Sequence, residues 1–147
     1  MGIKIVSENR KARYDYEIIE TIEAGMVLMG SEVKSLREGA CQLKDSYVVF
    51  RGEEAYLQGV HISPYKASSY NNHAPERLRK LLLHKEQLKK ISKQVQAKGL
   101  SCVPLKVYFK EGKAKVEIAL VRGKKAHDKR ETIKKREANR EMERRLR

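Results

Sequence analysis

The chain has 147 residues, 40% of them hydrophobic, which suffices for one domain with a core and excludes a wholly disordered chain. Its 33 Lys and Arg against 19 Asp and Glu give a net charge of +14, which indicates a polyanionic partner. The two cysteines form no CxxC motif, and no apolar run reaches the ~20 residues of a membrane span. We expect a cytoplasmic protein with no membrane association, no metal and no cofactor.

The positive charge is unevenly distributed along the chain. Residues 1–75 hold nine basic and ten acidic side chains, a net charge of −1. Residues 76–98 hold eight basic and two acidic ones, or +6, and residues 122–147 hold twelve and five, or +7. Solvation alone does not require this asymmetry, so these two segments are the first candidates for contact with a polyanion.

The first half of the chain predicts several strands and one short helix. Residues 14–22 alternate apolar and acidic side chains, which indicates a strand that the segment 23–25 interrupts, and residues 26–29 continue as a buried strand. Residues 31–39 predict a short helix capped by Ser31. Residues 45–50 and 55–62 predict a hairpin joined through residues 51–54, and the Ser, Asn and Pro content of residues 63–75 predicts a loop.

The second half predicts one long helix and a second hairpin. Apolar residues recur at helical spacing over residues 76–98, with Pro75 suited to the first turn and Gly99 to the end. Residues 103–110 then alternate with period two, and a Glu111-Gly112 turn leads to a return strand. This hairpin is expected to bury Val, Leu and Phe on one face and to expose the Lys and Tyr side chains on the other.

Six strands with a helix before the last pair predict a mainly β fold. We expect a small closed six-stranded antiparallel barrel of the OB type with flanking helices, a fold that binds oligonucleotides. The barrel domain is expected to span residues 1–122, with its long helix at about 76–98, and residues 123–147 form a separate basic tail. The tail has too few apolar side chains to bury a helix face, although its residues are good helix formers.

No constellation typical of an enzyme is visible. His61, His73, His84 and His127 are scattered, and HExxH, GxSxG and glycine-rich phosphate-binding motifs are absent from the sequence. We therefore expect no catalytic activity.

Two segments carry features of RNA binding. In NRKARYDY, residues 9–16, basic side chains that hold phosphates stand beside tyrosines that can stack on an unpaired base. In ERLRKLLLHK, Arg77 and Lys80 fall in the expected first helical turns, where the helix dipole favours acidic side chains. Bound phosphates would offset the unfavourable interaction of these two cations with the dipole. Leu82 lies ~100° off the apolar stripe of that helix and is either core or an exposed contact for a partner.

In order, the segments NRKARYDY, EAGMVLMGSEVKSLREG, LKDSY, HISPY, RKLLLHK, KGLSCVPLKVYFKEGKAKVE and RGKKAHDKRETIKKRE resemble the SmpB (SsrA-binding protein) family over roughly residues 9–140. The resemblance implies an OB-like barrel and a C-terminal tail that is disordered in free solution. It implies a function in trans-translation, the rescue of ribosomes stalled on mRNA without a stop codon. Proteins of this family bind the tRNA-like domain of transfer-messenger RNA (tmRNA, or SsrA RNA) and replace its missing anticodon arm.

The partners that the resemblance implies are tmRNA, the ribosome and, through tmRNA, elongation factor Tu. The tail is expected to fold as a helix in the empty mRNA channel, next to the decoding centre of 16S rRNA. Among the RNA contacts, Asn9 is expected to donate and accept at a base edge and Lys115 to hold a phosphate. Glu23 would accept from base amino groups or orient a neighbouring Arg.

The candidate RNA-binding residues are Asn9, Arg10, Lys11, Arg13, Tyr14, Glu23, Arg77, Lys80, Leu82 and Lys115. The candidate ribosome-binding residues of the tail are Gly123, which would let the chain turn, and Lys124, Lys125, His127, Asp128, Lys129, Arg130, Lys134, Lys135 and Arg136. Tyr14 departs from the family, which often has His there, and so does Ala74, where Asp is usual. The alternatives are a ribosomal or initiation-factor-like OB-fold protein, an RNA-processing enzyme on an OB scaffold and a general RNA chaperone.

Overall fold

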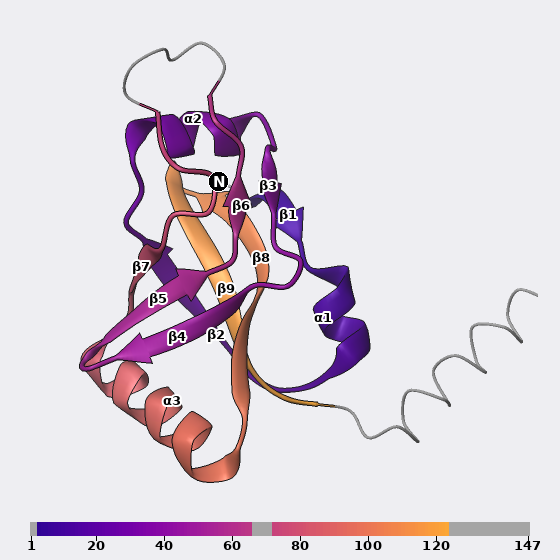
Figure 1. Cartoon of the computed structure of the whole chain (residues 1–147), viewed down its shortest axis with the longest axis vertical. Helices are drawn as coiled ribbons and strands as arrows, with labels where there is room; N and C mark the ends of the chain where they lie inside the picture. Colours follow the sequence, from indigo (N-terminus) through magenta and orange to yellow (C-terminus); the bar gives the residue numbers. More distant parts are fainter. Residues whose placement is uncertain (1–2, 66–71, 124–147) are drawn as a thin grey trace, which may run out of the picture.

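The computed structural model describes residues 3–65 and 72–123, which form an antiparallel β fold with three helices (Figure 1). Seven strands make the larger sheet, in the order β1-β8-β9-β2-β7-β5-β4. Its strands are β1 (Ile3–Glu8), β2 (Tyr16–Met26), β4 (Tyr47–Arg51), β5 (Glu54–Gln58), β7 (Arg79–Leu82), β8 (Ser101–Lys110) and β9 (Lys113–Gly123). A smaller sheet pairs β3 (Cys41–Gln42) with β6 (His61–Ile62), and the helices are α1 (Arg10–Asp15), α2 (Gly30–Arg37) and α3 (Lys85–Lys98).

The prediction of a mainly β antiparallel fold with few helices is confirmed, but the closed six-stranded barrel is not found in the described residues. The larger sheet has two unpaired edges, β1 and β4, so hydrogen bonding does not close it. It is strongly curved instead, because β4 at one edge packs against β8, the second strand from the other edge. The strand count was wrong because β1, β3 and β7 were not predicted, the segment 55–62 contains two strands (β5 and β6), and residues 26–29 do not form a separate strand.

The long helix predicted at about 76–98 is wrong in its first third. Helix α3 begins only at Lys85, and residues 79–82 form β7, which pairs with β5 on one side and β2 on the other. Leu81 of β7 is buried in the main core. Pairing on both edges together with this burial outweighs the helical propensity of a Leu- and Arg-rich segment. The end of the helix is as predicted, because Gly99 adopts the left-handed conformation with φ +63°.

Strand β2 is longer than predicted and runs through the expected interruption at residues 23–25. Ala24 is buried opposite Val116, and tertiary pairing on both sides holds the glycine that follows it in an extended conformation. The expected buried strand at 26–29 is also wrong, because Met26 ends β2. The predicted short helix exists as α2, but Glu32 caps its start by accepting from the Met29 amide at 2.8 Å.

Both predicted hairpins are present. Strands β4 and β5 turn between Arg51 and Glu54, and β8 and β9 are joined by Glu111 and Gly112, both with positive φ. The expected solvent face of β8 needs a correction, because Tyr108 is only 3% exposed. A register shift between Pro104 and Lys106 interrupts the regular alternation of that strand.

A buried ion-pair network holds β7 against α2 and was not predicted. Glu32 and Arg79 are both fully buried, and Arg79 Nε donates to Glu32 Oε2 at 2.6 Å. Arg79 also donates to the backbone carbonyls of Val60 and Pro75. Burial opposes the ionisation of Glu32, but hydrogen bonds from Arg77, the Met29 amide and Arg79 outweigh it and lower its pKa. The network therefore fixes the start of the strand that carries Lys80 and Leu82.

Candidate nucleic-acid interface

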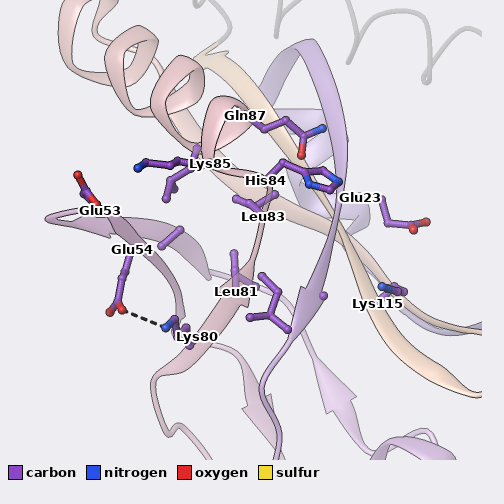
Figure 2. A pocket seen from close by; sticks show the side chains of 14 residues that line it. Glu23, Glu53, Glu54, Lys80, Leu81, Leu83, His84, Lys85, Gln87 and Lys115 are labelled. Carbon is purple, nitrogen blue, oxygen red and sulfur yellow. Dashed lines mark hydrogen bonds and ion pairs between the residues drawn. The ribbon is translucent and has the colours of Figure 1, made fainter.

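An open groove of about 710 Å³ lies on the outer face of the larger sheet where β2, β5, β7 and β9 meet, beside the start of α3 (Figure 2). Four of the candidate residues predicted from the sequence line it: Glu23, Lys80, Leu82 and Lys115. They come from three strands that are far apart in sequence. Figure 2 shows Glu23 and Lys115 on one side of the groove and Glu54 and Lys80 on the other.

The strand register explains why these side chains meet. Lys115 of β9 pairs with Tyr108 of β8 and with Gly25 of β2, and Gly25 pairs in turn with Leu82 of β7. These residues form one continuous row across four strands. A Cβ atom at Gly25 would lie 3.3 Å from the Leu82 Cβ, so the absence of a side chain there keeps the groove open between Lys115 and Leu82.

Glu23 is an ionised acceptor near two lysines, Lys110 and Lys115. The Tyr108 hydroxyl donates to its Oε2 atom, and Lys110 Nζ lies 3.5 Å from the same oxygen. The hydrogen bond from Tyr108 is the largest cause of the lowered pKa of Glu23. Burial, followed by the bond to Glu23, raises the pKa of Tyr108, so its hydroxyl stays protonated and donates. Tyr108 thus orients one carboxylate oxygen and leaves the other available to a ligand.

Leu82 is an exposed apolar contact point. The sequence left open whether it belongs to the core, and the structure decides for exposure, with 54% of the residue accessible. Because Leu81 points into the core, strand alternation turns Leu82 to the outside. An exposed leucine between Lys115 and Lys80 is suited to a ligand that presents both apolar surface and phosphate groups.

The opposite wall of the groove contains residues that the sequence analysis missed. Lys80 Nζ lies 3.0 Å from Glu54 Oε1, and the Tyr56 hydroxyl donates to Glu54 Oε2. The sequence signal was present in residues 54–58, where Glu, Tyr and Gln alternate with Ala and Leu. That pattern places the polar residues on the outer face of β5.

The chain is similar to known proteins over nearly its whole length. The protein family described as SmpB protein matches residues 6–147. The chain is 65% identical to the SsrA-binding protein of Bdellovibrio bacteriovorus over 138 residues, which is 94% of this chain and 91% of that protein. It is 55% identical to the SsrA-binding protein of Syntrophotalea carbinolica over 147 residues, which is 100% of this chain and 98% of that protein. The chain belongs to the SmpB family.

A solved structure agrees with this assignment. One chain of a solved structure, described as "tmRNA-SmpB: a journey to the center of the bacterial ribosome", is 54% identical to this chain. The two superpose with a TM-score of 0.69. The match covers 82% of this chain and 85% of that one. SmpB membership confirms the resemblance found in the sequence and the prediction of an RNA-binding protein that is not an enzyme.

The basic residues near the N-terminus of this SmpB family member lie apart from the groove, on α1 (Figure 1). Arg10, Lys11 and Arg13 are exposed, and Lys11 Nζ lies 3.0 Å from Asp45 Oδ1. Tyr14 is half-buried in the last turn of the same helix. Helix α1 packs through Ala12 on a small core cluster separate from the main one, formed with side chains of β8 and β9 (Val103, Leu105, Ala119 and Val121).

Asn9 has a structural role that differs from the expected contact with a base edge. It is 6% exposed and caps α1 by accepting from the Ala12 amide at 3.2 Å. Its amide nitrogen donates to the carbonyls of Leu43 at 3.3 Å and Pro104 at 3.0 Å, which uses both of its hydrogens. In this conformation Asn9 positions α1, and its side-chain hydrogen bonds are made within the protein.

Arg77 also differs from its expected position. It precedes β7 and does not belong to a helical turn, so the argument from the helix dipole does not hold for it or for Lys80. Its guanidinium forms an ion pair with buried Glu32 and donates to the Val27 carbonyl at 3.3 Å. The side chain keeps 32% exposure, and its described contacts are structural.

Of the tail candidates, only Gly123 is described. It is the last residue of β9 and pairs with Tyr16 in extended backbone, so the expected turn does not occur at Gly123 itself. The remaining candidates lie outside the described residues: Lys124, Lys125, His127, Asp128, Lys129, Arg130, Lys134, Lys135 and Arg136.

The described residues contain no group of three or more His, Cys, Asp or Glu side chains placed to bind a metal ion. Burial raises the pKa of Cys41 to about 11 and that of Cys102 to about 12, so both free thiols stay protonated. His73 is buried between Ser31 and the Ile62 carbonyl, and His84 precedes α3. No helix within residues 3–65 and 72–123 is long and apolar enough to cross a membrane.

Proposed function

We propose that this protein is the RNA-binding adaptor of trans-translation in the cytoplasm. It binds the tRNA-like domain of tmRNA and delivers it, together with elongation factor Tu bound to that RNA, to the A site of stalled ribosomes. The protein occupies the place of the anticodon arm. Membership of the SmpB family and the names of its relatives as SsrA-binding proteins support this function.

The observation that carries the proposal is the mixed character of the groove. A surface selected only for phosphates would contain cations alone, because each carboxylate weakens nonspecific binding to RNA. The groove instead holds ionised Glu23 beside Lys115 and exposed Leu82. Glu23 accepts from base amino groups, Lys115 holds a phosphate and Leu82 contacts an exposed base face. This combination suits the unpaired bases of a folded RNA better than a uniform duplex.

Helix α1 supplies a second, electrostatic contact. Arg10, Lys11 and Arg13 hold phosphates, and Tyr14 offers its ring to a base. Asn9 contributes by capping the helix and tying it to β8. Arg77 supports the groove through Glu32 and contacts RNA only with its exposed part.

The curved sheet of residues 1–122 acts as an OB-like platform, and residues 123–147 act as a ribosome-binding tail. The tail enters the empty mRNA channel next to the 16S rRNA decoding centre. Its helix formers and its charge of +7 support this role, since phosphate contacts offset the entropy cost of ordering.

A binding experiment tests the proposal. Affinity for a tRNA-like tmRNA fragment and for an ordinary tRNA is measured across a salt series with the wild type and with Glu23→Ala. We expect the tmRNA fragment to bind more than tenfold better at physiological salt and Glu23→Ala to reduce that preference, although removing an acid favours purely electrostatic binding. Equal affinities that fall together as salt rises would contradict the proposal.

A further inference from the structure

We propose that Glu54, Tyr56 and Lys80 form a second base-recognition subsite, on the wall of the groove opposite Glu23. This inference rests on the proposed function and adds specificity-determining residues to it. The ligand is an unpaired nucleotide of the same RNA, bound through a base amino group to Glu54 and a phosphate to Lys80.

Each wall of the groove carries a glutamate that is bound to a tyrosine and a lysine, although neither tyrosine lines the groove itself. On one wall Glu23 accepts from the Tyr108 hydroxyl and pairs with Lys110 at 3.5 Å. On the other wall Glu54 accepts from the Tyr56 hydroxyl and pairs with Lys80 at 3.0 Å. Both carboxylates belong to a Glu–Tyr–Lys cluster whose three members come from two strands: β2 and β8 for Glu23, and β5 and β7 for Glu54. The second cluster repeats the residue types, but Lys80 contacts Oε1 of Glu54 and Tyr56 contacts Oε2, so a base amino group would use a second acceptor position on one of these oxygens.

Exposure and charge also match. The Glu54 side chain is 46% exposed and that of Lys80 43%, compared with 38% for Glu23 and 44% for Lys110. The pKa of Glu54 is lowered by the hydrogen bond from Tyr56 and then by Lys80, so the carboxylate is ionised at neutral pH. A Glu–Lys pair has no net charge and adds little to nonspecific attraction. Its contribution to RNA binding lies in directional hydrogen bonds.

The strand register places Leu82 between the two carboxylates. Leu82 pairs with Gly25, which is two residues from Glu23 along β2. Because Ala55 pairs with Leu81 and the pairing is antiparallel, Glu54 lies beside Leu82 on the other side. Two strand spacings and two residues separate the backbone positions of Glu23 and Glu54, which is roughly 12 Å along the sheet.

This separation determines what can bind. Stacked bases are about 3.4 Å apart, so the bases that contact Glu23 and Glu54 cannot be stacked directly on one another. The exposed leucine lies where an intervening base would otherwise stack. The groove therefore fits an RNA region in which unpaired bases are splayed apart, and it disfavours a regular helix.

The test compares Glu54→Gln and Tyr56→Phe with Glu20→Gln. Glu20 is a matched control, because it also pairs with a lysine, Lys90, at 3.4 Å but does not line the groove. We expect Glu54→Gln to reduce the preference for a tRNA-like tmRNA fragment over ordinary tRNA about tenfold, without weakening the binding of ordinary tRNA. Tyr56→Phe reduces it less, and Glu20→Gln leaves it unchanged. Thermal unfolding checks that all variants are folded.

Chemical probing of the bound fragment adds a readout that a structural role would not change. We expect Glu54→Gln and Glu23→Gln to expose different unpaired bases of the fragment. In the double variant, the preference for the tmRNA fragment should fall by the product of the two single fold-changes. The inference is overturned if Glu23→Gln loses preference while Glu54→Gln behaves as Glu20→Gln, or if both variants expose the same base. A wild-type protein without any preference overturns the proposed function, and the inference with it.

Discussion

The groove and the surface of α1 differ in how their charges are arranged. In the groove, Glu23 and Glu54 pair with lysines and accept from tyrosine hydroxyls, so both carboxylates have fixed partners. On α1, Arg10 and Arg13 are exposed and form no ion pair within the described part of the chain. Paired charges add little long-range attraction but create directional contacts, whereas exposed cations attract any polyanion. We infer that α1 contributes affinity and the groove contributes selectivity.

The largest effect is expected from Glu32→Ala, which leaves Arg79 buried without its partner and releases β7. The free energy of unfolding should fall by about 3–5 kcal/mol, as for other broken buried ion pairs. Urea denaturation measures it, with exposed Glu38→Ala as the control. If Glu32→Ala kept wild-type stability and selectivity, the network would not be what positions the groove.

Neutralising α1 should weaken binding to every RNA. The triple variant Arg10→Gln, Lys11→Gln, Arg13→Gln is expected to lower the slope of log affinity against log salt by about 2–3 for both the tmRNA fragment and ordinary tRNA. The ratio of the two affinities should stay constant. A control with three lysines changed to Gln away from α1 and the groove (Lys34, Lys89 and Lys93) separates this effect from net charge. A changed ratio would show that α1 also reads the RNA.

Leu82→Ala should affect the groove alone. Because Leu82 is 54% exposed, we expect stability to change by no more than about 0.5 kcal/mol. The preference for the tmRNA fragment should fall about tenfold, since fully burying a leucine side chain contributes about 1.5–3 kcal/mol and a contact with a base face buries the exposed part of Leu82. Competition binding against ordinary tRNA measures it, with exposed Ile19→Ala as the matched control. An equal loss in both variants would argue against a specific contact.

The smallest expected effect is on the stability of the folded state at acidic pH. The hydrogen bond from Tyr108 lowers the pKa of Glu23 from its ordinary 4.5, so the folded state is stabilised above pH 4.5. That stabilisation should be lost as the pH falls through the lowered pKa, and Glu23→Gln should make the pH dependence shallower there. Unfolding measured from pH 6 downward tests this, with Glu20→Gln as the control. Identical curves for the wild type and Glu23→Gln would rule out the bond's contribution to stability.

Strong local patterns made parts of the fold predictable. The β8–β9 hairpin has period-two alternation and a Glu-Gly turn, and α2 has a helical period. The prediction for residues 79–82 was wrong because their pattern fits a helix and only the neighbouring strands make them a strand. Helix α1 was not predicted for a similar reason, since its stability depends on the Asn9 cap and on packing of Ala12.

The same distinction holds for the groove. Glu23, Lys80, Leu82 and Lys115 could be named from the sequence, three of them through resemblance to a family, but nothing in it indicated that they share one surface. Glu54 and Tyr56 were missed because their strand alternation alone does not tell which strand lies beside β5.

The sequence by itself determined the composition of the molecule and the elements with strong periods. It also determined the family, since the order of motifs along the chain can be read without knowing any tertiary contact. Only the tertiary structure decided that residues 79–82 form a strand, that Asn9 is a buried cap and that two Glu–Tyr–Lys clusters lie on opposite sides of Leu82. The physical reason is that strand pairing joins residues distant in sequence, and the free energy of those contacts exceeds local preference.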